Sequence, residues 1–61
     1  MEKAYKKSLK VIRSCETNLQ IRSAYNYIYL FWKLYENEPG CSKLYKRLKD
    51  KCKVKKRLIN G

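Results

Sequence analysis

The chain has 61 residues, enough for one domain with a marginal core, because a domain of this size buries only about 60% of its unfolded surface. Apolar residues make up 44% of the chain, and six Tyr, one Trp and one Phe are among them, which excludes disorder throughout. Sixteen Lys and Arg against five Asp and Glu give a net charge of +11, an imbalance that destabilises a compact chain and favours an anionic partner.

The cations are concentrated toward the two ends of the sequence. Residues 1–14 carry five Lys or Arg and one Glu, and residues 41–61 carry nine Lys or Arg and one Asp. Residues 15–40 carry only two cations against three acidic residues. This distribution predicts basic surfaces around a nearly neutral, apolar centre.

The first segment, about 2–14, has the pattern of an amphipathic helix with a basic stripe. Its apolar residues recur at helical spacing, with Ser8 and Cys15 on the same side: Met1, Tyr5, Leu9 and Ile12. Its cations fall on a different face: Lys3, Lys6, Lys7, Lys10 and Arg13.

A second helix is predicted over about 18–36, starting from a capping box. Thr17 can accept a hydrogen bond from the amide of Gln20, while the Gln20 side chain reaches back to the amide of Thr17. Residues 14–16 then form a short corner between the first two helices.

The second helix carries two neighbouring apolar stripes. One consists of Ile21, Ala24, Tyr25, Ile28, Phe31, Trp32 and Tyr35, and the other of Tyr27, Leu30 and Leu34. A helix that is apolar over most of its circumference must be covered on more than one side. We therefore expect it to be buried between the first and third helices.

The third helix is predicted over about 42–58, after the only strong break in the chain. Residues 37–40 read Asn-Glu-Pro-Gly, and Ser42 is the predicted N-cap. Its apolar face consists of Cys41, Leu44, Tyr45, Leu48 and Cys52. Nine cations exceed what the helix dipole requires, and we expect the basic tail from about Val54 to fray or to order only on binding. The whole chain, 1–61, is thus predicted to be one all-α, three-helix domain.

Cys15, Cys41 and Cys52 form no C-x-x-C pair, and the chain contains no histidine. A zinc site within one chain is therefore not expected, and we predict buried free thiols, no metal and no other cofactor. The first residues lack the apolar run of a signal peptide, and the longest uncharged run, 23–32, is too short to span a bilayer. We expect a cytoplasmic protein, with membrane binding disfavoured because the third segment is poor in large apolar residues.

Residues 12–35 resemble a pattern found in small, mostly uncharacterised bacteriophage-encoded helical proteins. The elements that carry the resemblance are Ile12-x-Ser14-Cys15-x-Thr17, Gln20-Ile21, Ala24, Tyr27-Ile28, Leu30 and Lys33. It covers somewhat under half of the chain. The resemblance implies a phage or mobile-element origin, hence the cytoplasm of a host, and a helical fold. It implies no catalytic residue and no ligand.

The sequence offers little that could support catalysis. It has no histidine, no Gly-rich phosphate loop and no pair of carboxylates beside apolar sequence. Asp50 lies among lysines, and Cys52 falls on the apolar face, where a buried thiol is expected rather than a nucleophile. We therefore predict no enzyme and no small-molecule substrate.

The basic surfaces are the main candidates for function, because phosphate binding needs charge density more than a motif. The alternative is a solvated lysine face that keeps the protein soluble. Tyr29, between Asn26 and Lys33 on the polar strip, is predicted to be exposed and suits base stacking or a protein interface. The other candidate residues are Lys43, Lys46, Arg47, Lys49, Lys53, Lys56 and Arg57 on the third helix, and Lys3, Lys7, Lys10 and Arg13 on the first.

The leading hypothesis is a nucleic-acid-associated protein that contacts mainly phosphate, with little sequence preference. A helix-turn-helix is disfavoured because residues 37–41 exceed its usual turn length. The alternative is a protein-binding module, such as a phage factor that inhibits or redirects an acidic host protein, or a minor component of a larger assembly. Apolar area around Trp32 would serve that role. Homo-oligomerisation through the central helix is compatible with either hypothesis.

Overall fold

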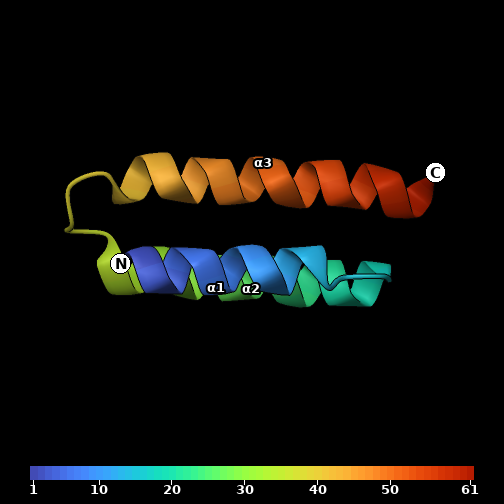
Figure 1. Cartoon of the computed structure of the whole chain (residues 1–61), viewed down its shortest axis with the longest axis horizontal. Coiled ribbons are helices and arrows are strands. Elements are labelled where there is room, and N and C mark those ends of the chain that lie inside the picture. Colours follow the sequence, from blue (N-terminus) through green and yellow to red (C-terminus); the bar gives the residue numbers. More distant parts are fainter.

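The computed structural model describes all 61 residues as three helices joined by two short connections, without a strand. They are α1 (Glu2–Arg13), α2 (Asn18–Tyr35) and α3 (Cys41–Asn60). The chain runs up, down and up again, so that α2 is antiparallel to both α1 and α3 (Figure 1). Each helix contacts the other two, in a bundle of 36 × 15 × 15 Å. The predicted all-α, three-helix domain is confirmed.

The corner between α1 and α2 is held by the predicted capping box. The Thr17 hydroxyl accepts from the amide of Gln20 at 3.2 Å, and the Gln20 side-chain oxygen accepts from the amide of Thr17 at 3.2 Å. The Cys15 thiol donates to the carbonyls of Val11 at 3.2 Å and Gln20 at 3.4 Å. This thiol therefore joins the last turn of α1 to the first turn of α2.

The start of α3 differs from the prediction. The helix begins at Cys41, its N-cap is Gly40 rather than Ser42, and Ser42 lies within the first turn. Gly40 has φ +84°, a left-handed conformation that glycine adopts without the steric cost of a Cβ atom. Its carbonyl accepts from the amide of Leu44 at 3.2 Å, which begins the helical hydrogen bonding. Backbone geometry at the glycine, not a side-chain cap, starts this helix.

The C-terminal part of α3 is a regular helix as far as Asn60, and this range includes the basic stretch from Val54. Two contacts join this stretch to the rest of the bundle. Lys55 donates from its ammonium to the carbonyl of Arg13 at 3.0 Å, and Ile59 packs against the core. The Lys55 contact places a cation at the negative end of the α1 dipole.

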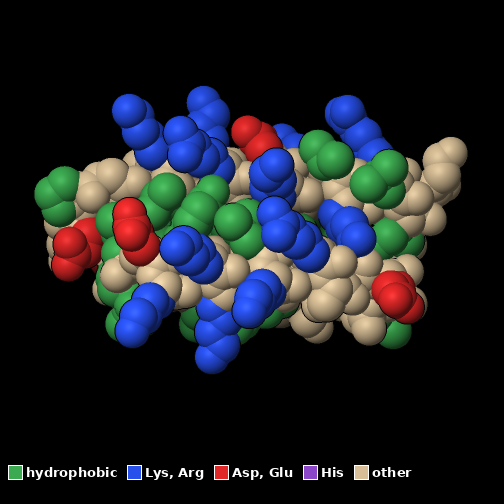
Figure 2. Space-filling view, viewed as in Figure 1, with side chains coloured by type: hydrophobic (Ala, Val, Ile, Leu, Met, Phe, Trp, Pro, Cys, Tyr) green, Lys and Arg blue, Asp and Glu red, His purple; other side chains and the backbone are tan.

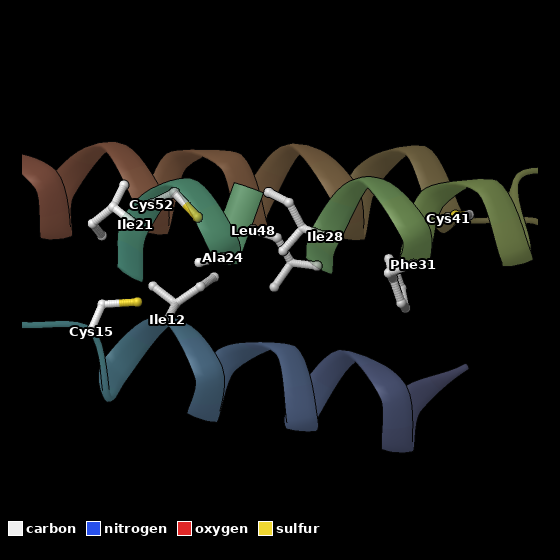
Figure 3. Close-up of a cluster of buried hydrophobic side chains, with 9 residues drawn as sticks. All are labelled: Ile12, Cys15, Ile21, Ala24, Ile28, Phe31, Cys41, Leu48 and Cys52. Carbon is white, nitrogen blue, oxygen red and sulfur yellow. The ribbon is translucent and has the colours of Figure 1, made fainter. Parts of the chain in front are cut away.

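The core consists of nine buried apolar residues contributed by all three helices and the first corner (Figure 3). Ser8 is also fully buried, and its hydroxyl donates to the carbonyl of Ala4 at 2.8 Å, so its burial leaves no unpaired group. The core residues are Ile12, Cys15, Ile21, Ala24, Ile28, Phe31, Cys41, Leu48 and Cys52.

α2 packs between α1 and α3 as predicted, but its second apolar stripe is left largely exposed. Leu30 is 65% exposed and Leu34 is 73% exposed, while Tyr27 is half-buried. With only two other helices in the bundle, α1 and α3 cover two adjacent sides of α2, and the third side faces solvent. The helix is central in its contacts but open along one face.

Candidate nucleic-acid interface

The cations of α1 form a ridge on the outside of the bundle. Helical spacing brings four of them around one shallow hollow, which they line alone: Lys3, Lys6, Lys7 and Lys10. Arg13 follows in the last turn, and all five cations are exposed. The candidates Lys3, Lys7 and Lys10 are therefore brought together, and Lys6 joins them.

A second group flanks an open groove of about 590 Å³ between α1 and α3. Its floor is apolar, and its charged lining consists of Glu2, Lys6, Lys43 and Arg47. Figure 2 shows this face, with Lys and Arg side chains along both helices and hydrophobic side chains between them. The helices α1 and α3 run in the same direction (Figure 1), and the groove receives Lys6 from α1 and Lys43 and Arg47 from α3.

A third group lies on the outer side of α3. Lys46, Lys53 and Arg57 are seven and four residues apart, so they share one ridge of the helix. Lys53 and Arg57 also line a hollow with Lys56 near the end of α3. Their side chains are exposed to solvent.

The face formed by α2 and α3 combines cations with aromatic rings. The rings of Tyr29 and Trp32 lie 6.3 Å apart between centroids, and those of Trp32 and Tyr45 lie 5.7 Å apart across the two helices. The Lys33 ammonium lies 5.9 Å from the Tyr29 ring and 5.7 Å from the Trp32 ring. The Lys49 ammonium lies 5.3 Å from the Tyr45 ring. We call Tyr29, Trp32, Tyr45, Lys33 and Lys49 the aromatic row.

This basic, aromatic face continues toward the first turn of α2. There, Arg22, Tyr25 and Lys56 line a hollow of about 380 Å³ together with Asn18, Leu19 and Ile21. Lys56 therefore lines both this hollow and the one that it shares with Lys53 and Arg57.

Sequence reasoning selected Tyr29 and Lys49 but missed the rest of the aromatic row. Lys33 follows Tyr29 by four residues, and Lys49 follows Tyr45 by four, spacings at which side chains meet on a helix. That signal was present in the sequence. The contact between Trp32 and Tyr45 joins two helices, and it depends on how α2 and α3 pack.

The three cysteines are buried free thiols. Burial raises the pKa of Cys52 to about 11, with the neighbouring Cys15 adding to the effect. Burial likewise raises the pKa of Cys15, against the opposing charge of Lys55, and raises the pKa of Cys41, where Glu36 and Glu38 add to it. All three therefore remain protonated near neutral pH. No three His, Cys, Asp or Glu side chains are grouped so that they could hold a metal ion.

None of the three helices combines the length and apolar character needed to cross a bilayer. No protein-family model, curated protein or solved structure matches the chain.

Proposed function

We propose that the chain is a non-enzymatic, nucleic-acid-associated protein that binds phosphate groups through the cations of α3 and α1. The observation that carries the proposal is the number of Lys and Arg side chains exposed to solvent. Eight of the nine cations on α3 and all five on α1 are exposed, and the only acidic residues of these helices are Glu2 and Asp50. Only Lys55 is half-buried, and its ammonium is bound to a backbone carbonyl.

Binding of this kind draws its free energy from the release of condensed counterions, one for each phosphate that a Lys or Arg neutralises. It needs no particular base sequence, and α3 offers few Arg or Asn side chains that could read base edges. Insertion of α3 as the recognition helix of a helix-turn-helix is disfavoured. In that motif the two helices cross at about 90–120°, whereas α2 and α3 lie antiparallel (Figure 1).

The salt dependence of binding to duplex and single-stranded DNA tests the proposal. The logarithm of the affinity should fall linearly with the logarithm of the salt concentration, by roughly 0.9 per neutralised phosphate on duplex DNA. Reversing the charges of Lys46, Arg47 and Lys53 together should flatten this slope and leave helicity unchanged, because all three side chains are exposed. Binding no stronger than that of an unstructured basic peptide of equal charge would exclude the proposal.

A second candidate function, a protein-binding module, is favoured by the open face of α2. A groove of about 220 Å³ lies between α1 and α2, and none of its lining residues is charged. They are Ala4, Ser8, Tyr27, Leu30, Phe31, Leu34 and Tyr35. Lys7 lies one helical turn from Ala4, a lining residue on α1, which places one cation beside this groove. An amphipathic helix with acidic residues beside its apolar stripe would fit, as on an acidic host protein bound by a phage factor.

Nuclease treatment separates this candidate from the first. A protein partner should stay bound to the chain after nuclease treatment. Its binding should be lost when Leu30 and Leu34 are replaced by Glu. Leu58→Glu is the matched control, since Leu58 is as exposed as Leu34 but lies on α3. If both variants capture the partner equally, the face of α2 that carries Leu30 and Leu34 does not bind it.

A further inference from the structure

The aromatic row narrows the ligand to one class of nucleic acid, an inference that rests on the proposed function. We propose that Tyr29, Trp32 and Tyr45 form a stacking platform for the bases of single-stranded nucleic acid. Lys33 and Lys49 would bind the adjoining phosphates. The site lies on the α2–α3 face, away from the groove between α1 and α3 and from the apolar face of α2.

The geometry of the rings supports stacking. Trp32 is tilted by 31° against Tyr29 and again by 31° against Tyr45, so the three rings form a row that passes from α2 to α3. Tyr29 is 47% exposed and is the most open ring of the row, while Trp32 and Tyr45 are half-buried. Packing between the helices holds the inner rings in place, and the outer ring is accessible to a base.

The two lysines are placed to serve the phosphates of the same strand. The ammonium of Lys33 lies over two rings and that of Lys49 over the third, yet both side chains are exposed. A cation–aromatic contact at an exposed site is weak, so a phosphate group can draw the ammonium away and leave the ring face free for a base. Arg22 and Lys56 continue the positive charge along the same face.

The chemistry of the site selects among ligands. Aromatic rings can also bind quaternary ammonium groups, but here two lysines occupy the ring faces and would repel a cation. In a duplex the base faces are covered by their neighbours, and only a single strand presents them to a protein side chain. An anionic ligand with free aromatic faces fits both requirements, and a single-stranded nucleic acid is such a ligand.

Trp32 is the only tryptophan of the chain, so its fluorescence reports on the site directly. The full chain is titrated with oligothymidylate, with an abasic strand of the same length and with a duplex, and affinity is measured independently by the anisotropy of labelled strands. We expect oligothymidylate to quench Trp32 and to bind more tightly than the abasic strand. Stacking of one base corresponds to roughly a five- to 150-fold difference in affinity.

Variants of Tyr29 assign the difference to the ring. Tyr29→Ala should remove most of the preference for the strand with bases, while Tyr29→Phe keeps the ring and should retain it. Leu30→Ala is the matched control, because Leu30 is also exposed but points to a different face of α2. This control should leave both affinities unchanged.

The outcomes separate this inference from the proposed function. Equal affinity for the abasic and base-bearing strands with unchanged fluorescence would overturn stacking and leave phosphate binding in place. Equal quenching by the abasic strand, or tighter binding of the duplex, would also overturn stacking. No binding of any strand would overturn both.

Discussion

Cysteine is the residue that this core uses as a small apolar group. Cys15, Cys41 and Cys52 are all buried, and each has a raised pKa because burial disfavours the thiolate. Cys15 and Cys41 lie where a helix ends or begins, and Cys52 lies in the middle of α3. Their placement on apolar stripes was predicted from spacing, whereas the hydrogen bonds of Cys15 across the corner depend on its geometry.

Alkaline pH should therefore destabilise the fold. A thiol with an ordinary pKa of 9.0 in the unfolded chain and of about 11 in the folded state, as for Cys52, loses its proton first in the unfolded chain. Its contribution to the free energy of unfolding is complete below pH 9.0 and is lost as pH rises toward about 11. Denaturant titrations across this range should show the fall, and Cys52→Ala, which removes the thiol, should show a smaller one. If stability fell equally with pH in both proteins, Cys52 would not be the cause of the alkaline destabilisation.

Replacement of a core residue should unfold so small a domain. Ile28 is 1% exposed and lies at the centre of the α2 face that contacts the other helices, so Ile28→Ala should cost about 2–5 kcal/mol. This is comparable to the stability expected of a domain of this size. Leu34→Ala on the exposed face should change stability by less than about 0.5 kcal/mol. Thermal melts followed by circular dichroism compare the two, and similar melting temperatures would contradict the assignment of the core.

Each of the three helices was predicted from the sequence. The structure differs from the prediction at the start of α3 and in the exposure of one face of α2. The start of α2 was predicted because its capping box is formed by Thr17 and Gln20, two residues three apart in the sequence. The start of α3 was misplaced because its cap is a backbone conformation at Gly40. The apolar pattern of α2 identified Leu30 and Leu34 as apolar but could not indicate which sides the neighbouring helices would leave open.

Gly40 gives a prediction at this scale. Its φ of +84° is unfavourable for residues with a Cβ, although a Cβ here would meet no atom within 4 Å. Gly40→Ala should therefore cost about 1–2 kcal/mol from backbone strain alone. Gly40→Asn should cost less, because Asn tolerates the left-handed region better. Denaturant titrations measure both, and an Ala variant as stable as the parent would show that the turn can relax.

The net charge of +11 makes the cations of the molecule repel one another. The bundle is only 15 Å across, and the Debye length is about 8 Å at physiological ionic strength and about 30 Å at 0.01 M. At low salt, cations on α1 and α3 therefore repel one another across the bundle. The candidate site reflects the same distribution, since the predicted cations lie on several faces of one narrow rod. Sequence could predict their number and exposure, but not that packing would divide them among a groove, two ridges and an aromatic row.

Salt should consequently act in opposite directions on folding and on binding. Screening relieves repulsion within the bundle, so the melting temperature of the free protein should rise with salt, while the affinity for nucleic acid falls. Reversing Lys46, Arg47 and Lys53 lowers the net charge by two for each residue, from +11 to +5. This variant should melt higher than the parent at low salt and show a smaller change in both measurements. Should its melting temperature instead be lower at low salt with helicity preserved, the three cations would stabilise the fold, and repulsion would not be their main effect.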